Sequence, residues 1–145
     1  MIGLVQRVSR ADVSVDGHEI AAIGRGLLVL VAVHRDDTER NVLRMADRIL
    51  GYRVFPDDEG RMNRSVRDIS GDLLLVPQFT LAADTKKGTR ASFTKAASPE
   101  QGAAFFAQLA EICGNTLGHV GTGKFGANMQ VSLVNDGPVT FWLES

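Results

Sequence analysis

Cysteine, proline and aromatic residues are scarce in this chain of 145 residues. It contains one cysteine, four prolines and 6% aromatic residues. The lone cysteine, Cys113, excludes an internal disulfide framework. Low proline content, together with 44% hydrophobic and 23% charged residues, argues against disorder. This composition predicts one compact domain over residues 1–145, with a hydrophobic core of its own.

Long hydrophobic runs and a large excess of one charge are also missing. The longest strongly apolar run, residues 27–33, is far shorter than the roughly 20 residues of a membrane-spanning helix, so we expect no membrane insertion. The chain opens with no pattern typical of a secretion signal, which together with the single cysteine indicates a cytoplasmic protein. A net charge of −1 implies that any contact with nucleic acid is local. The cationic residues of segment 86–95 could meet a few phosphates, or could form a solvated loop: Lys86, Lys87, Arg90 and Lys95.

Residue patterns of metal sites and nucleophilic triads are absent as well. His18, His34 and His119 are scattered along the chain, and the only thiol lies inside a predicted helix, so we expect no metal and no other cofactor. No serine lies in a Gly-x-Ser-x-Gly elbow or beside an identifiable base. The acidic residues 57–59 indicate an exposed turn. Composition and spacing alone therefore leave the chemistry undetermined.

The first 23 residues alternate between apolar and polar side chains, which predicts short strands. Apolar positions alternate over residues 2–8 and again over 13–15, and the polar stretch 9–12 between them predicts a turn. Asp16-Gly17 is typical of a type I′ turn, which leads into a further strand at residues 19–23.

Three later segments also predict strands. Residues 27–34 form an unbroken apolar run, as in a central strand of a sheet. Residues 73–81 form a second run, which should stop pairing, bulge or reach an edge near Pro77 because proline has no N–H to donate. Residues 129–143 alternate on either side of segment 135–138, which predicts two strands or one broken strand.

Two segments have helical periodicity. Residues 39–50 carry one apolar face, preceded by capping side chains at 36–38. Residues 98–101, Ser-Pro-Glu-Gln, combine a capping hydroxyl, a proline at the first helical position and a glutamine three residues after the cap. They predict a helix that ends at Gly114, with Cys113 as a core residue. The whole pattern predicts an α+β fold, with a largely antiparallel sheet or barrel and two main helices.

Two short motifs identify the chain more specifically. Residues 77–80 read PQFT, and residues 135–140 read NDGPVT. With the opening MIGLVQRVSRADVSVDG and the stretch GYRVFPDDEGRMN, they make the chain resemble the D-aminoacyl-tRNA deacylase family over essentially its whole length. The common motifs of that family are Ser-Gln-Phe-Thr and Asn-x-Gly-Pro-Val-Thr. The chain departs from the first motif at Pro77, which we interpret as shaping the backbone before Gln78.

The resemblance implies a homodimer that hydrolyses the ester bond between a D-amino acid and its transfer RNA, without a metal. Main-chain N–H groups around Phe79 and Thr80 would stabilise the developing oxyanion, while the 2′-hydroxyl of the terminal ribose assists the reaction. The implied catalytic residues are thus Phe79 and Thr80. The implied partner is the aminoacylated 3′ end of tRNA.

The same resemblance implies five residues that bind the substrate: Gln78, Phe125, Met129, Gly137 and Pro138. Gly137-Pro138 would form a cis dipeptide that enters the pocket of the partner subunit. There it would block an L side chain but admit a D-residue or glycine, so that selectivity arises from a steric clash. Phe125 and Met129 could equally belong to the hydrophobic core.

Two other functions fit the sequence. One is a noncatalytic RNA-binding module that uses residues 86–95 as its contact surface. The other is a small-molecule ester or amide hydrolase with Thr80 as nucleophile, for which no base is identified in the sequence. A deacylase hydrolyses D-aminoacyl-tRNA, whereas a noncatalytic RNA-binding module does not. A hydrolase with Thr80 as nucleophile would form a covalent intermediate, which the deacylase would not.

Overall fold

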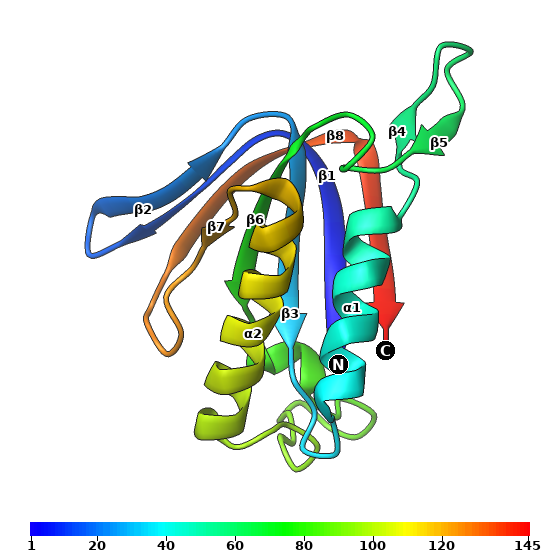
Figure 1. Ribbon diagram of the computed structural model, residues 1–145. Helices are drawn as coiled ribbons and strands as arrows, with labels where there is room; N and C mark the ends of the chain where they lie inside the picture. The colour runs from blue at the N-terminus through cyan, green and yellow to red at the C-terminus, as the bar shows by residue number, and fades with distance from the viewer.

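A mostly antiparallel sheet and two helices make up a single domain (Figure 1). The computed structural model describes residues 1–145. Its elements in chain order are β1 (Ile2–Val15), β2 (His18–Ile23), β3 (Gly26–Ala32), α1 (Glu39–Gly51), β4 (Phe55–Pro56), β5 (Met62–Arg64), β6 (Asp72–Pro77), the 3-10 helix η1 (Phe79–Ala82), α2 (Pro99–Leu117), β7 (Gly121–Thr122) and β8 (Gln130–Glu144). β1 pairs antiparallel with β2, β3 and β8, while β6 runs parallel to both β3 and β7. The α+β prediction is confirmed.

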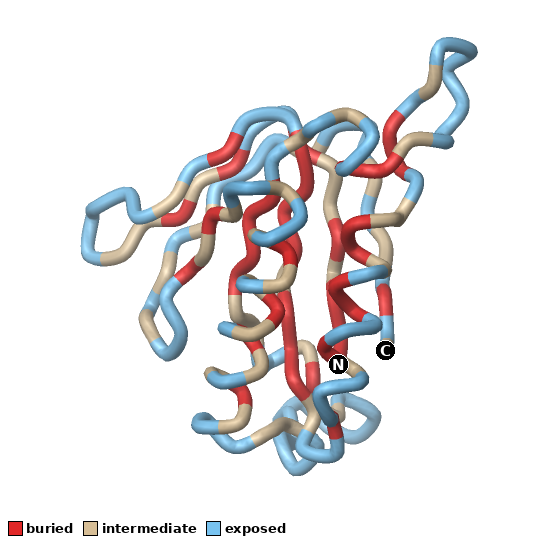
Figure 2. Tube along the Cα trace, in the orientation of Figure 1, coloured by how far each residue is buried: buried red, intermediate tan, exposed pale blue.

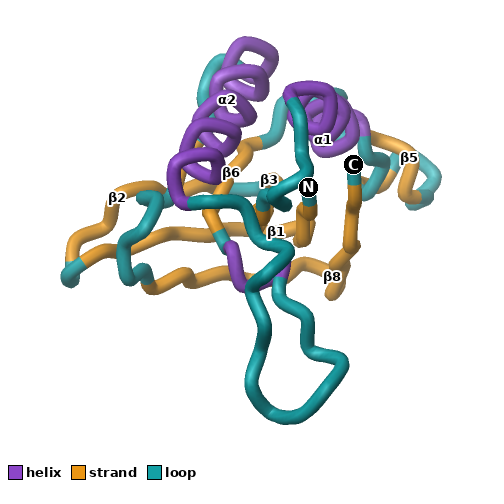
Figure 3. Tube along the Cα trace, turned by 90° about the horizontal axis from the view of Figure 1, so that it is seen from below, coloured by secondary structure: helices purple, strands orange, loops and turns teal.

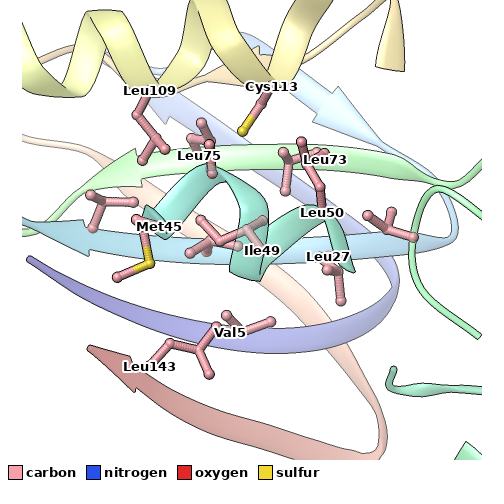
Figure 4. Packing of buried hydrophobic residues seen from close by; sticks show 14 of the residues in the cluster. Val5, Leu27, Met45, Ile49, Leu50, Leu73, Leu75, Leu109, Cys113 and Leu143 are labelled. Atoms are coloured by element: carbon pink, nitrogen blue, oxygen red, sulfur yellow. The ribbon is translucent and has the colours of Figure 1, made fainter. Parts of the chain in front are cut away.

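Both helices cover the same face of the sheet (Figures 1 and 3). The main hydrophobic core lies between them and the strands, as Figure 4 shows. It includes Met45 and Ile49 from α1, Leu109 from α2, and Leu27 and Leu75 from the sheet, all fully buried. Burying this many apolar side chains is the main driving force that holds the two layers together.

The opposite face of the central strands is buried too. Leu28 of β3 and Leu74 of β6 belong to a second cluster that includes Val8 and Val13 of β1. β3 and β6 are therefore covered on both faces, and Figure 2 colours most of their residues as buried. A strand in this position has no solvent-facing side, so its sequence is continuously apolar rather than alternating. The prediction of a central strand from the run at residues 27–34 is confirmed.

The turn predicted at residues 9–12 is wrong, because β1 continues unbroken to Val15. Arg10 and Asp12 pair with Val134 and Ser132 of β8. Register shifts on either side of Val8 change which residues face the core, and these irregularities, not a turn, interrupt the alternation. The next turn is as predicted: residues 16 and 17 have φ values of 50° and 76°, as a type I′ turn requires.

Both helices begin where the sequence predicts. Thr38 caps α1, and the Ser98 hydroxyl accepts a hydrogen bond from the Gln101 N–H at 3.3 Å at the start of α2. The predicted end of α2 at Gly114 is wrong, since the helix continues to Leu117 and is capped by Gly118. Gly118 has a φ of 80°, a conformation that favours glycine. No helix is both long and apolar enough to cross a membrane.

Cys113 is a core residue, as predicted. Its side chain is fully buried in the main cluster (Figure 4). Burial among apolar groups raises the pKa of this thiol to about 12, because a thiolate would lose its hydration there. The thiol is therefore neutral near pH 7 and unsuited to act as a nucleophile.

Candidate active site

Pro77 marks the point where the sheet ends. It is the last residue of β6 and lies opposite Val31 of β3. The Gln78 N–H donates to the Val31 carbonyl at 2.7 Å, after which the chain leaves the sheet as η1. In β6 the N–H groups of alternate residues face β3, so the N–H that Pro77 lacks would face β7, where the pairing ends at Thr122. The predicted break in residues 73–81 is confirmed.

Two adjoining cavities, of about 360 and 320 Å³, open at this end of β3 and β6. Their common wall consists of five residues: Pro77, Gln78, Phe79, Phe125 and Gly126. The first cavity extends to the end of β3 and the start of α2, and the second extends to Met129 and Val131. Volumes of this size suit a small-molecule ligand. Four of the predicted site residues thus lie together: Gln78, Phe79, Phe125 and Met129.

Aromatic side chains line the mouth of the cavities. Phe79 is 57% exposed and packs against Phe93, with ring centroids 5.1 Å apart. The Phe125 ring lies against α2 at Gly102, where an added Cβ would come within 3.2 Å of it. Large exposed rings around a concavity provide flat apolar surface for a ligand. Met129 lines the second cavity and also packs against the second hydrophobic cluster, so it belongs to both.

The backbone at the start of η1 offers free donors. The N–H groups of Phe79 and Thr80 are the first of this short helix, which have no intrahelical acceptor, and no loop, turn or side-chain hydrogen bond uses them. The Thr80 hydroxyl accepts a hydrogen bond from the Gln78 side-chain amide, and the Thr80 side chain lines neither cavity. Of the two predicted catalytic residues, Phe79 lines both cavities, whereas Thr80 places no nucleophile inside them.

Ionisable side chains are absent from the walls of both cavities. Their polar lining side chains are Gln78, Ser98 and Asn128. No three His, Cys, Asp or Glu side chains lie close enough together to hold a metal ion. A reaction in these cavities therefore receives no proton-transfer group from the lining side chains of this chain.

The second motif lies elsewhere, in a bulge of β8. Asn135 pairs with Val8 and Thr140 pairs with Gln6, so the four residues between them loop out opposite a single residue of β1. The Asn135 amide donates to the Thr140 hydroxyl at 2.8 Å, and its oxygen accepts from the Val139 N–H at 2.9 Å. The Asn and Thr of the motif thus close the bulge, whose Gly137-Pro138 peptide bond is cis, as the resemblance implies.

Arg7 holds the bulge against the body of the molecule. Its guanidinium donates to the carbonyls of Asp136 and Val54, at 3.0 and 2.6 Å, and lies 3.4 Å from the Asp136 carboxylate. Gly137 has a φ of 136°, and an added Cβ would lie 2.6 Å from the Val139 side chain. Glycine is therefore the residue that this backbone accepts.

The bulge and the cavities are far apart within one chain. Val8, which pairs with Asn135, also pairs with Gly26, the first residue of β3, whereas the cavities open at Val31. Five residues of strand separate these positions, which corresponds to about 16 Å. The structure does not bring Gly137 and Pro138 to the other predicted site residues of the same chain.

Several residues of the cavity wall were not predicted from the sequence. They are Val31 and Val33 at the end of β3, Phe93 and Ala96 from the loop before α2, the N-cap residue Ser98, and Pro99, Gly102 and Phe106 from α2. The sequence assigned Ser98 and Pro99 to helix capping alone. Phe93 does carry a signal in the sequence, since a phenylalanine among basic and polar residues is unusual in a solvated loop.

Known proteins provide an independent comparison. The family model described as D-Tyr-tRNA(Tyr) deacylase matches residues 4–144. A D-aminoacyl-tRNA deacylase of Alkalilimnicola ehrlichii is 63% identical over 145 residues, covering 100% of this chain and 97% of the relative. One from Escherichia coli O1:K1 is 53% identical over 144 residues, covering 99% of each.

Solved structures with a similar fold support the same comparison. A protein named c-Myc DNA unwinding element binding protein superposes with a TM-score of 0.95 at 42% identity, over 100% of this chain and 99% of the other. A probable eukaryotic D-amino acid tRNA deacylase shares the fold, with a TM-score of 0.86 at 19% identity over 99% of this chain and 98% of the other. With a family model that spans nearly all residues and a relative at 63% identity, this chain belongs to the D-Tyr-tRNA(Tyr) deacylase family.

Proposed function

We propose that this protein hydrolyses the ester bond of D-aminoacyl-tRNA and of glycyl-tRNA, releasing the free amino acid and tRNA. The observation that carries the proposal is the pair of adjoining cavities, whose common wall includes Gln78 and Phe79 of the family motif. Two connected cavities suit a ligand with two parts, a terminal adenosine and an aminoacyl group. Relatives named D-aminoacyl-tRNA deacylase at 53–63% identity support the same substrate.

The proposed mechanism relies on main-chain groups and on the substrate. Water attacks the ester carbonyl, and the oxyanion that forms accepts hydrogen bonds from the free N–H groups of Phe79 and Thr80. The ribose 2′-hydroxyl assists proton transfer, because the lining side chains include no acid or base. The ester C–O bond then breaks, and the 3′-oxygen of the ribose leaves with a proton. No metal takes part.

Selection against L-amino acids requires, in this proposal, a second copy of the chain. The Gly137-Pro138 bulge is exposed and lies about 16 Å along the strands from the cavities of its own chain. It can therefore reach a cavity only in a partner subunit, where its backbone would clash with an L side chain. β8 pairs on one side only and exposes Leu133, Val134 and Trp142, an apolar surface suited to a homodimer interface.

Incubation with D-tyrosyl-, L-tyrosyl- and glycyl-tRNA tests the activity. We expect hydrolysis of the D-tyrosyl and glycyl esters and little of the L-tyrosyl ester, in a reaction that chelators leave unchanged. Substrate with a 2′-deoxy terminal ribose should react far more slowly. Absence of D-specific turnover by the folded dimer would refute the proposal, and loss of activity restored by zinc would refute its metal-free mechanism. Since aminoacyl-tRNA is a cytoplasmic substrate, we also propose that the protein acts in the cytoplasm.

Nothing in the site favours the two other functions suggested by the sequence. The Thr80 hydroxyl has a single partner, the Gln78 amide, which cannot act as a base. Mass spectrometry of the enzyme during turnover should therefore detect no acyl-Thr80. A noncatalytic RNA-binding module would bind tRNA without releasing the amino acid, an outcome that the same incubation detects.

A further inference from the structure

The loop between η1 and α2, residues 83–97, projects from the body of the molecule (Figure 3). Phe93, Ala96 and Ala97 of this loop line the first cavity. It carries four exposed cations, Lys86, Lys87, Arg90 and Lys95. Residues 85–97 contain no acidic side chain. Lys95 lies 4.0 Å from Asp84, but no ion pair within the chain involves any of the other three. A chain with net charge −1 therefore concentrates unpaired positive charge at one place.

This loop is tied to the cavities at its base. Asp84 and Ser92 exchange two backbone hydrogen bonds of 2.7 and 3.1 Å, and the Lys95 carbonyl accepts from the Arg35 N–H at 3.0 Å. Phe93 lines the first cavity and packs against Phe79. The unpaired cations therefore lie within a loop whose ends are joined at Asp84 and Ser92, next to the cavity residue Phe93.

One cluster of acidic side chains lies far from the loop, whereas the carboxylates of Asp36 and Asp84 near its base pair with Arg35 and Lys95. Asp57, Asp58 and Glu59 lie on the β4–β5 hairpin, which Figure 1 places at the opposite end of the molecule from the loop. An anionic ligand that enters the cavity thus approaches a basic rim without meeting this acidic cluster. Lys124, exposed and adjacent to Phe125, adds a further cation beside the cavity.

We infer that Lys86, Lys87 and Arg90 bind the phosphates of the tRNA 3′ strand that precede the terminal adenosine. The inference rests on the proposed function, which takes aminoacyl-tRNA as substrate. If the terminal nucleoside occupies the cavities, the preceding phosphates must cross the rim, where these cations lie. Contacts to phosphate contribute affinity without reading sequence, so the loop would serve many tRNAs alike.

The test compares two variants that remove equal charge. In the loop variant Lys86→Gln/Lys87→Gln/Arg90→Gln, KM for D-aminoacyl-tRNA should rise roughly tenfold while kcat stays unchanged. The slope of log(kcat/KM) against log[salt] should become shallower by about 2, at roughly 0.7 per contact with a single strand. The control variant Arg40→Gln/Arg44→Gln/Arg67→Gln removes three exposed arginines without an ion pair and should behave as the wild type.

A short substrate separates phosphate binding from damage to the cavity. D-aminoacyl-adenosine has no preceding phosphate, so the loop variant should hydrolyse it as fast as the wild type does. The inference would be overturned if the loop variant lost kcat/KM equally on both substrates or kept the wild-type salt slope. It would also be overturned if the control variant lost as much kcat/KM as the loop variant. If the wild type hydrolyses neither substrate, the proposed function fails. In that case, the affinity of the wild type and the loop variant for uncharged tRNA is measured against salt concentration. The same change in slope is expected, and an unchanged slope overturns the loop inference.

Discussion

A proline interrupts two strands of this protein, with opposite results. In β6, pairing with β3 ends at Pro77 and the sheet opens into two cavities. In β8, pairing with β1 resumes after Pro138, because side chains of Asn135 and Thr140 close the loop of residues that has no partners. A strand can therefore end at a proline or continue past it, and in β8 the side chains of Asn135 and Thr140 allow it to continue.

The two interruptions also differ in what they present. The break at Pro77 exposes main-chain donors beside a concave surface, whereas the bulge at Pro138 presents a convex, exposed backbone fixed by Arg7. Each supplies one part of the proposed site, and they lie at opposite ends of the central strands. Variants that affect one region should therefore have effects distinct from those that affect the other.

The largest effect is expected at the bulge, from Gly137→Ala. The added Cβ would lie 2.6 Å from the Val139 side chain at a φ of 136°, so the bulge must change shape. A misplacement of about 1 Å at a site can cost roughly 100-fold in rate, and we expect a fall in kcat/KM of about that size. Steady-state kinetics on D-tyrosyl-tRNA measures it, with circular dichroism to confirm folding. A folded variant with wild-type kinetics would show that the bulge is unrelated to the site.

Arg7→Met should have a smaller effect of the same kind. It removes hydrogen bonds from a charged donor to two carbonyls, which should lower the free energy of unfolding by about 2 kcal/mol. Without these hydrogen bonds the bulge is held less firmly. The preference for D- over L-tyrosyl-tRNA should therefore fall by roughly tenfold, or about 1.4 kcal/mol. Arg10→Met, an exposed residue on the same strand with no side-chain partner, is the matched control. Unchanged selectivity in Arg7→Met would mean that the bulge keeps its shape without this arginine.

At the other interruption, Thr80→Ala should lower kcat by less than tenfold. It deletes the acceptor of the Gln78 amide but leaves the backbone N–H, whose removal would instead cost roughly 100- to 1000-fold. Thr80→Ser, which keeps the hydroxyl, should retain wild-type kcat. Single-turnover kinetics of the two variants distinguishes a main-chain donor from a nucleophilic hydroxyl. If the hydroxyl were the nucleophile, Thr80→Ala would be inactive.

The smallest effect on activity is expected far from both interruptions, at Cys113. Cys113→Ala should preserve kcat/KM and reduce the free energy of unfolding by about 1 kcal/mol through lost packing. The buried thiol has its pKa raised to about 12, so it favours folding below the ordinary thiol pKa. That contribution is lost as pH rises from about 9 to about 12, because the unfolded chain then gains a thiolate that the core excludes. Urea unfolding at pH 8 and pH 10 should show a larger decline for the wild type than for Cys113→Ala.

Much of the fold could be predicted from short segments of sequence. The type I′ turn at Asp16-Gly17, the start of α2 at Ser98 and the end of β6 at Pro77 depend on φ preferences, capping groups and a missing donor, which are local properties. The two errors also have local causes. The polar residues 9–12 have the composition of a turn but belong to a partly exposed strand. Gly114 has the composition of a helix end, but the helix ends at Gly118.

The motifs, not the residue chemistry, pointed to the site, since the sequence contains no triad or metal-ligand cluster that could have done so. Gln78, Phe79 and Thr80 are adjacent in sequence, so their grouping needed no tertiary information. Tertiary structure alone decided that Val31, Phe93 and Gly102 meet them around a cavity, because these residues come from separate segments that the packing of α2 on the sheet brings together. It also decided that Gly137-Pro138 lies at the far end of the strands, because strand register, which depends on long-range pairing, determines that distance.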